Sequence, residues 1–111
     1  MSDNVIEIDA SRYDGEVLQS PVPVVLDFYS TECPPCEALA PKFESVADAF
    51  AGKVKFVKIF RQGNRELAQQ LGVSGSPTLV FYKGGEEVGE RMTGEEIKKT
   101  AIKAQVEALL G

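Results

Sequence analysis

The chain has 111 residues, enough for one domain with a single buried core, and we expect residues 1–111 to form that domain. Its 17 acidic and 12 basic side chains give a net charge of −5, which argues against nucleic acid as a partner because such binding needs a basic face. No apolar stretch reaches the roughly 20 residues that a membrane span requires, so no membrane partner is expected.

The first half of the chain alternates strand and helix patterns. Residues 5–8 alternate apolar and polar side chains and predict a short edge strand, followed by a brief helical stretch over 13–18. An almost unbroken apolar run over 22–29 is typical of a strand that is covered on both faces. From 33 to 50, apolar residues recur every three or four positions, which predicts a helix with Pro41 inside it.

The second half continues this alternation. Residues 55–60 predict another strand, and Asn64 is a suitable N-cap for a short helix over 65–71. A further strand is expected over 78–82, where β-branched and aromatic residues predominate.

The C-terminal part combines a hairpin and a helix. Two glycines before 87–92 are a turn signal, so this segment should return antiparallel to the preceding strand. Thr93 and Glu96 have the spacing of a capping box ahead of a last helix over 95–110. The order βαβαβαββα therefore predicts an α/β protein with a central mixed β-sheet flanked by helices on both faces.

Two features of the composition bear on location and chemistry. Residues 1–5 lack the basic and apolar regions of a secretory signal, so we expect a cytoplasmic protein, in which a stable structural disulfide would be unusual. Histidine is absent, which excludes imidazole acid–base chemistry and histidine-ligated metals.

The two cysteines of the chain occur together as Cys33-Pro34-Pro35-Cys36. A structural zinc site needs four good ligands, and this chain alone offers two sulfurs plus carboxylates, so no metal is expected unless two chains share it. Two buried cysteines without a role are another alternative. In a cytosolic α/β chain the spacing favours a dithiol that cycles with a disulfide and needs no bound cofactor.

The predicted helix start gives the two sulfurs different roles. Cys33 falls at or next to the N-cap, with Pro34 at the first helical position, where its missing N–H costs nothing. The helix dipole and free N–H groups favour a thiolate there, so Cys33 is the expected nucleophile. Cys36 is expected to be more buried and to resolve the mixed disulfide. Pro35 removes a second donor near Cys33, which should favour action as a reductant.

A carboxylate interrupts the apolar strand a few residues before the cysteines. Burial raises the pKa of a carboxyl group unless it is paired, so Asp27 is suited to accept the proton of Cys36, directly or through water. Capping a turn at the strand end is the alternative. Lys58, on the next strand with Phe56 and Phe60, either faces Asp27 and adjusts its charge or is simply solvated.

Ser76-Pro77 opens the strand over 78–82, an unusual position for proline. A cis bond there would place the Ser76 backbone beside the cysteines, where its N–H and C=O could pair with an extended substrate. A trans bond is the default for any X-Pro pair.

In this order and spacing, these features resemble the thioredoxin family across nearly the whole chain. The segments that carry the resemblance are Val24-Val25-Leu26-Asp27-Phe28-Tyr29, Cys33-Pro34-Pro35-Cys36, Leu39-Ala40-Pro41, Lys58, Gly75-Ser76-Pro77-Thr78-Leu79 and Gly94. The resemblance implies a thioredoxin fold, a redox-active disulfide between Cys33 and Cys36, Asp27 as the buried proton acceptor and a cis bond before Pro77.

The resemblance also implies a function, that of a monomeric protein-disulfide reductase. Its expected partners are protein disulfides and a thioredoxin-reductase-like electron donor. The site residues it implies are catalytic Cys33, Cys36, Asp27 and Lys58, and substrate-binding Pro34, Ser76, Pro77 and Gly94.

Three positions depart from the family pattern. Glu32 stands where the family usually has tryptophan, Pro34-Pro35 replaces Gly-Pro, and residues 60–63 lack the usual acidic residue. Glu32 places a negative charge beside Cys33, which opposes thiolate formation. Two alternatives remain: a non-catalytic binding module that holds a partner around Ser76-Pro77, and a glutathione-dependent, glutaredoxin-like reductase. The long segment before the cysteines argues against the second.

Overall fold

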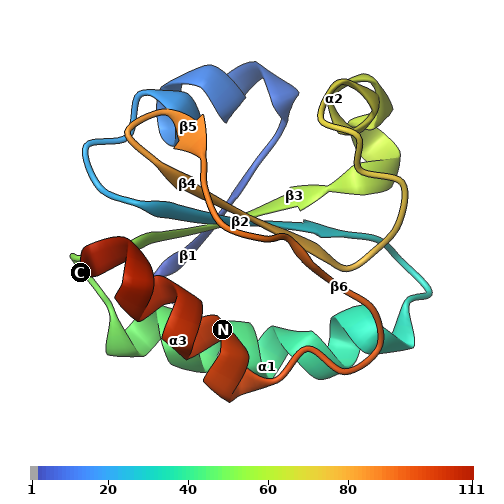
Figure 1. The fold of residues 1–111 in the computed structure, drawn as a ribbon. Coiled ribbons are helices and arrows are strands. Elements are labelled where there is room, and N and C mark those ends of the chain that lie inside the picture. Colours follow the sequence, from blue (N-terminus) through green and yellow to red (C-terminus); the bar gives the residue numbers. More distant parts are fainter. Residues whose placement is uncertain (1–2) are drawn as a thin grey trace.

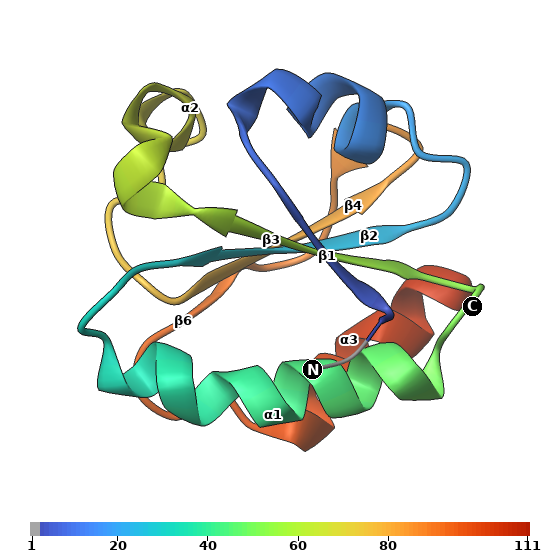
Figure 2. The ribbon, with the colours of Figure 1, turned by 180° about the vertical axis from the view of Figure 1, so that it is seen from behind.

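In a computed structural model, which describes residues 3–111, a central sheet separates two layers of helices (Figures 1 and 2). The helices α1 and α3 cover one face, while α2 and a short N-terminal helical segment cover the other. The strands are β1 (Val5–Ile8), β2 (Val24–Tyr29), β3 (Lys55–Phe60), β4 (Thr78–Lys83), β5 (Glu86–Glu87) and β6 (Met92–Thr93). The helices are α1 (Pro34–Ala49), α2 (Arg65–Gln70) and α3 (Lys99–Leu110), with 3-10 turns at Ala10–Arg12 (η1) and Arg61–Gly63 (η3) and a π-helical turn at Asp14–Leu18 (η2).

The sheet is mixed, as predicted. Its strands lie in the order β1-β3-β2-β4-β5, and β6 also pairs with β4. β3 is parallel to both β1 and β2, whereas β4 runs antiparallel to β2. Because of that reversal, Thr78 at the start of β4 pairs with Phe28 near the end of β2. The residues just before β4 therefore lie at the same sheet edge as the start of α1.

Burial on both faces explains the continuous apolar run of β2. Val25 and Phe56 pack in the layer under α1 and α3, whereas Leu26, Val57 and Ile59 pack in the opposite layer. Successive side chains of a strand point to opposite faces. Asp27 therefore falls on the same face as Val25, toward α1.

Two predicted elements differ in the C-terminal part. The expected strand over 87–92 is divided into β5 and β6, with Gly89 between them at φ +71°, where a Cβ atom would meet the side chain of Gln105. The last helix begins at Lys99, not at 95, and the predicted capping box is wrong. Thr93 belongs instead to β6, where it pairs with Thr78.

The brief helical stretch expected over 13–18 is confirmed as a π-helical turn at Asp14–Leu18, preceded by a 3-10 turn. The predicted role of Asn64 needs correction. Asn64 does not cap α2 with its side chain. Its Oδ1 accepts a hydrogen bond from the Ala10 N–H and its Nδ2 donates to the Phe60 carbonyl, both at 2.8 Å, so it joins two segments far apart in the sequence.

Candidate active site

A disulfide between Cys33 and Cys36 lies where the loop after β2 enters α1, with the two Cα atoms 5.2 Å apart. Cys33 is the N-cap of α1 and Pro34 the first helical residue, as predicted. The Cys36 N–H donates to the Cys33 Sγ at 3.2 Å. A backbone donor and the positive end of a 16-residue helix thus both favour negative charge on this sulfur once the disulfide opens.

Burial does not distinguish the two cysteines. Cys33 is 8% exposed and Cys36 is 9% exposed, so the prediction that Cys36 is the more buried residue is wrong for the oxidised protein. The reason is that the closed disulfide holds the Cys33 sulfur against the loop before β4. The two sulfurs differ in their partners, since only Cys33 accepts the helix N–H and contacts that loop.

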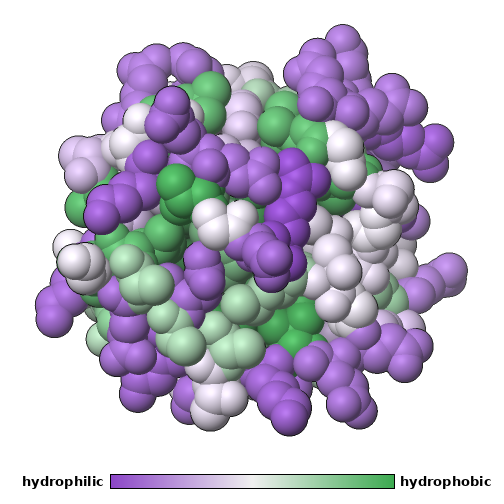
Figure 3. All heavy atoms as spheres, viewed as in Figure 1, coloured by the Kyte–Doolittle hydropathy of each residue, from purple (hydrophilic) through white to green (hydrophobic). Residues whose placement is uncertain are grey.

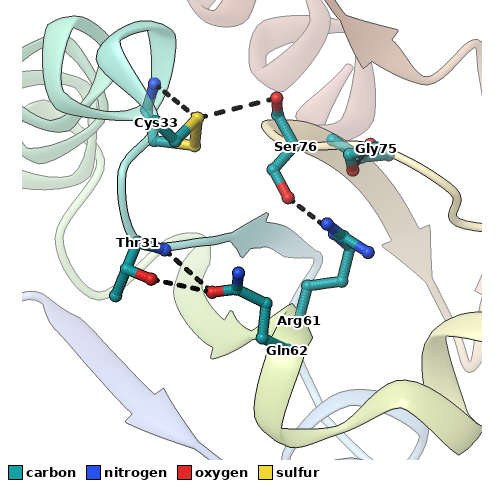
Figure 4. Close-up of a disulfide and its surroundings, with 8 residues drawn as sticks. Thr31, Cys33, Arg61, Gln62, Gly75 and Ser76 are labelled. Atoms are coloured by element: carbon teal, nitrogen blue, oxygen red, sulfur yellow. Dashed lines mark hydrogen bonds between the residues drawn. A yellow bond between two sulfur atoms is a disulfide. The ribbon is translucent and has the colours of Figure 1, made fainter.

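The loop before β4 contains a cis peptide bond between Ser76 and Pro77. The Ser76 carbonyl oxygen lies 3.7 Å from the Cys33 Sγ (Figure 4). A disulfide sulfur has no proton to donate, so this is a van der Waals contact in the oxidised protein. The bond isomer and the placement beside the cysteines agree with the resemblance described above.

Asp27 is a buried carboxylate, 3% exposed. Among residues 3–111 its Oδ1 has no hydrogen-bond partner. Burial raises the pKa of Asp27 from 3.8 to about 7, although the positive charge of Lys58 lowers it in part. Cys36 belongs to the buried stripe of α1 with Leu39 and Phe43, which faces the same side of the sheet. Asp27 and Cys36 therefore share one layer.

Lys58 is the register partner of Asp27 on the adjacent parallel strand. Its Nζ lies 4.4 Å from the centre of the Tyr29 ring, within the range of a cation–π interaction. The Tyr29 hydroxyl in turn donates to the Glu7 carboxylate. Lys58 is thus half-buried and held near Asp27 rather than fully solvated.

Two polar side chains that sequence analysis did not assign bridge the loops around the disulfide (Figure 4). Arg61 Nε donates to the Ser76 Oγ at 2.7 Å. Gln62 Oε1 accepts from the Thr31 N–H and from its Oγ1, both at 3.0 Å. The carboxyl ends of the parallel strands β2 and β3 meet at one edge of the sheet. Polar residues directly after β3 could therefore have been expected to contact the loop after β2.

The four predicted substrate-binding residues separate into two places. Ser76, Pro77 and Gly94 line one surface cavity of about 300 Å³. Gly94 has φ +100°, a backbone conformation that other residues rarely adopt. Pro34 lies in a different cavity, with Pro35 and Ala38 of α1. The disulfide at the start of α1 and the loop before β4 thus carry separate parts of the candidate binding surface.

Within residues 3–111, no helix is both long and apolar enough to cross a bilayer. No group of three or more cysteine and carboxylate side chains in this range is arranged to hold a metal ion.

A disulfide capping a helix, facing a cis-proline loop on a mixed sheet, defines a thiol-disulfide exchange protein of the α/β class. Comparison with known proteins specifies the family: the model of the thioredoxin family matches residues 4–108. The chain is 36% identical over 111 residues to a thioredoxin of Peptoclostridium acidaminophilum, covering all of both chains. It is 36% identical to thioredoxin 1 of Nostoc sp. over 101 residues, covering 91% of this chain and 92% of the relative. The chain belongs to the thioredoxin family and is a thiol-disulfide oxidoreductase.

Proposed function

We propose that this chain works as a cytoplasmic protein-disulfide reductase that helps to keep protein thiols reduced. The observation that carries the proposal is the combination of a helix-capping sulfur with a buried carboxylate in the layer behind it, one oxygen of which has no hydrogen-bond partner within residues 3–111. Relatives named thioredoxin at 31–36% identity support a thiol-disulfide oxidoreductase.

In the first step the Cys33 thiolate attacks one sulfur of the client disulfide. A Cys33–client disulfide forms, the client S–S bond breaks, and the other client sulfur leaves as a thiolate that takes a proton from solvent. Access of the client chain beside Ser76 is supported by the contact between the Ser76 carbonyl and the Cys33 Sγ. Pro34, Pro77 and Gly94 form the surrounding contact surface.

In the second step the Cys36 thiol gives its proton to Asp27 and attacks the Cys33 sulfur. The Cys33–Cys36 bond forms and the second client thiolate leaves, so two electrons pass from the dithiol to the client. A pKa of about 7 suits Asp27 for accepting a proton near neutral pH. Lys58 adjusts the charge of Asp27, and we assign both as positioning and proton-transfer groups for Cys36.

The cycle closes when an external donor returns two electrons to the Cys33–Cys36 disulfide. A thioredoxin-reductase-like protein is the proposed donor, and no bound cofactor is required in this chain. We propose that the chain acts as a monomer.

Reduction of insulin driven by dithiothreitol tests this function. Cys33→Ser should fall to the rate of dithiothreitol alone, because the attacking sulfur is lost. Cys36→Ser should still attack but accumulate as a covalent adduct with insulin that is visible on a non-reducing gel. Glu37→Gln, an exposed change in the same helical turn, serves as the control and should keep the parent rate. Full activity of Cys33→Ser would refute the proposal.

A further inference from the structure

The surface beside Ser76 has a local charge opposite to that of the chain. A cavity of about 390 Å³ is lined by Arg61, Arg65, Gln69 and neighbouring small residues, none of which is acidic. The adjoining cavity at Ser76 shares residues 72–74 with it and also has no acidic lining residue. In a chain with 17 acidic side chains, a lining that is entirely neutral or basic sets this surface apart.

The charges of two arginines there are not neutralised by carboxylates. Within residues 3–111, neither Arg61 nor Arg65 forms an ion pair. The side-chain hydrogen bond of Arg61 uses Nε, which leaves its two terminal nitrogens for another acceptor. Arg91, which lines the adjoining cavity, provides a contrast, because Glu87 accepts two hydrogen bonds from it at 2.8 and 2.9 Å.

The position of Arg61 is fixed relative to the reactive sulfur. Arg61 holds the hydroxyl of Ser76, and the carbonyl of that same residue touches the Cys33 Sγ (Figure 4). A client chain joined to Cys33 rises about 3.3 Å per residue when extended. We therefore expect side chains one to three residues from the client cysteine to reach Arg61 and the cavity that it lines together with Arg65.

We propose that Arg61 and Arg65 form a specificity site for a carboxylate side chain that flanks the cysteine of a client polypeptide. The planar guanidinium fork matches a carboxylate with two parallel hydrogen bonds. In the space-filling view, the weakly polar surface of the loop before β4 lies beside the strongly hydrophilic side chains of α2 (Figure 3). This surface suits a polar, charged client rather than an apolar one. The inference rests on the proposed reductase function, whose client class it narrows.

Matched peptide disulfides test the site. Each substrate carries one glutamate, glutamine or lysine within three residues of its cysteine, on either side. The rate at which the pre-reduced protein reduces each peptide is measured by rapid-reaction kinetics. At the favoured position the glutamate peptide should react about fivefold to tenfold faster than the glutamine peptide, and the lysine peptide slowest. Raising the salt concentration should shrink this preference, because the interaction is between charges.

Variants assign the preference to the arginines. The double variant Arg61→Gln/Arg65→Gln should lose the glutamate-over-glutamine ratio, whatever its absolute rate. Arg65→Gln alone, an exposed change on α2, should reduce the ratio in part and leaves the Arg61–Ser76 hydrogen bond untouched. Lys53→Gln removes one positive charge, as Arg65→Gln does, but lies beyond the far end of α1. This control should keep the parent ratio.

Three other outcomes would overturn the inference. Equal rates for the glutamate and glutamine peptides, with all of them reduced, would reject the site while leaving the reductase function intact. Failure to reduce any peptide or insulin would reject the function and the site together. A loss of rate in the double variant that is confined to glutathione disulfide would replace the polypeptide client with a small-molecule carboxylate.

Discussion

Two regions border the Cys33–Cys36 disulfide, and they treat polar groups in opposite ways. On the surface side, Arg61 and Gln62 form hydrogen bonds to the two loops that flank the sulfurs. On the sheet side, Asp27 is buried among apolar residues with an oxygen that has no partner within the described chain. The hydrogen bonds on the surface side hold both loops, whereas one oxygen of the buried carboxylate has no partner within residues 3–111.

This difference indicates a division of roles. A satisfied network stabilises one geometry and holds the loops in place, whereas an unpaired buried carboxylate keeps its proton to higher pH and can exchange it during a reaction. The buried carboxylate lowers the stability of the folded protein when it is ionised. The raised pKa of Asp27 determines the pH range over which this loss of stability occurs. Four measurements test this division of roles.

The stability of the oxidised protein should depend on pH through Asp27. Its pKa is 3.8 in the unfolded chain and about 7 in the folded one, so the folded state binds the proton more tightly. The contribution of Asp27 to stability is therefore fully present below about pH 4 and is lost as pH rises to about 7. Asp27→Asn should remove this dependence and raise the free energy of unfolding at pH 8 by about 2–4 kcal/mol, as measured by urea denaturation. Glu66→Gln, an exposed carboxylate, is the control; a parent-like pH profile in Asp27→Asn would contradict the assignment.

The same substitution should slow the second chemical step more than the first. Without a proton acceptor, resolution of the mixed disulfide by Cys36 should slow about tenfold to a hundredfold, while attack by Cys33 changes little. Quenched-flow samples on non-reducing gels would show the mixed disulfide accumulating at pH 7. Equal slowing of both steps would demote Asp27 to a structural role.

In the surface region, Gln62→Ala removes the acceptor of two Thr31 hydrogen bonds. The expected loss is about 0.5–1.5 kcal/mol of unfolding free energy, together with faster hydrogen exchange at the Thr31 amide. Gln62→Glu keeps an oxygen acceptor at the same position and should retain most of the protection. A similar loss of unfolding free energy in both variants would show that Gln62 stabilises the loop in another way than through its oxygen acceptor.

The smallest effect concerns Lys58. Its positive charge lowers the pKa of Asp27, so Lys58→Met should raise that pKa. The loss of stability should then extend to a higher pH. NMR titration of the Asp27 carboxyl carbon measures the change. Lys103→Met, an exposed change on α3, should leave the titration in place; an unmoved titration in Lys58→Met would indicate that solvent screens the pair.

Local patterns were sufficient to predict most strands and the place of the two cysteines at the start of α1. An almost unbroken apolar run identifies β2, and the position of Pro34 after Cys33 identifies the start of α1, because both signals lie within a few residues of the feature. The burial of Asp27 was expected from its place within that run.

The features that sequence analysis missed depend on partners distant in the sequence. Asn64 bonds to Ala10, 54 residues away, and Arg61 bonds to Ser76 across 15 residues. Thr93 is drawn into β6 by pairing with Thr78, which moves the start of α3 to Lys99. The near-equal burial of the two cysteines likewise depends on the loop before β4, which only the folded sheet brings to them.

Pro34 and Pro35 limit how far the catalytic turn can rearrange. Each proline ring holds its φ angle near one value, so the first turn of α1 has few conformations available when the disulfide opens. Opening then changes mainly the torsions of two cysteine side chains, and the cycle demands little backbone reorganisation. A client is accordingly expected to adapt its own shape to this rigid turn, which favours substrates whose disulfides lie in flexible segments.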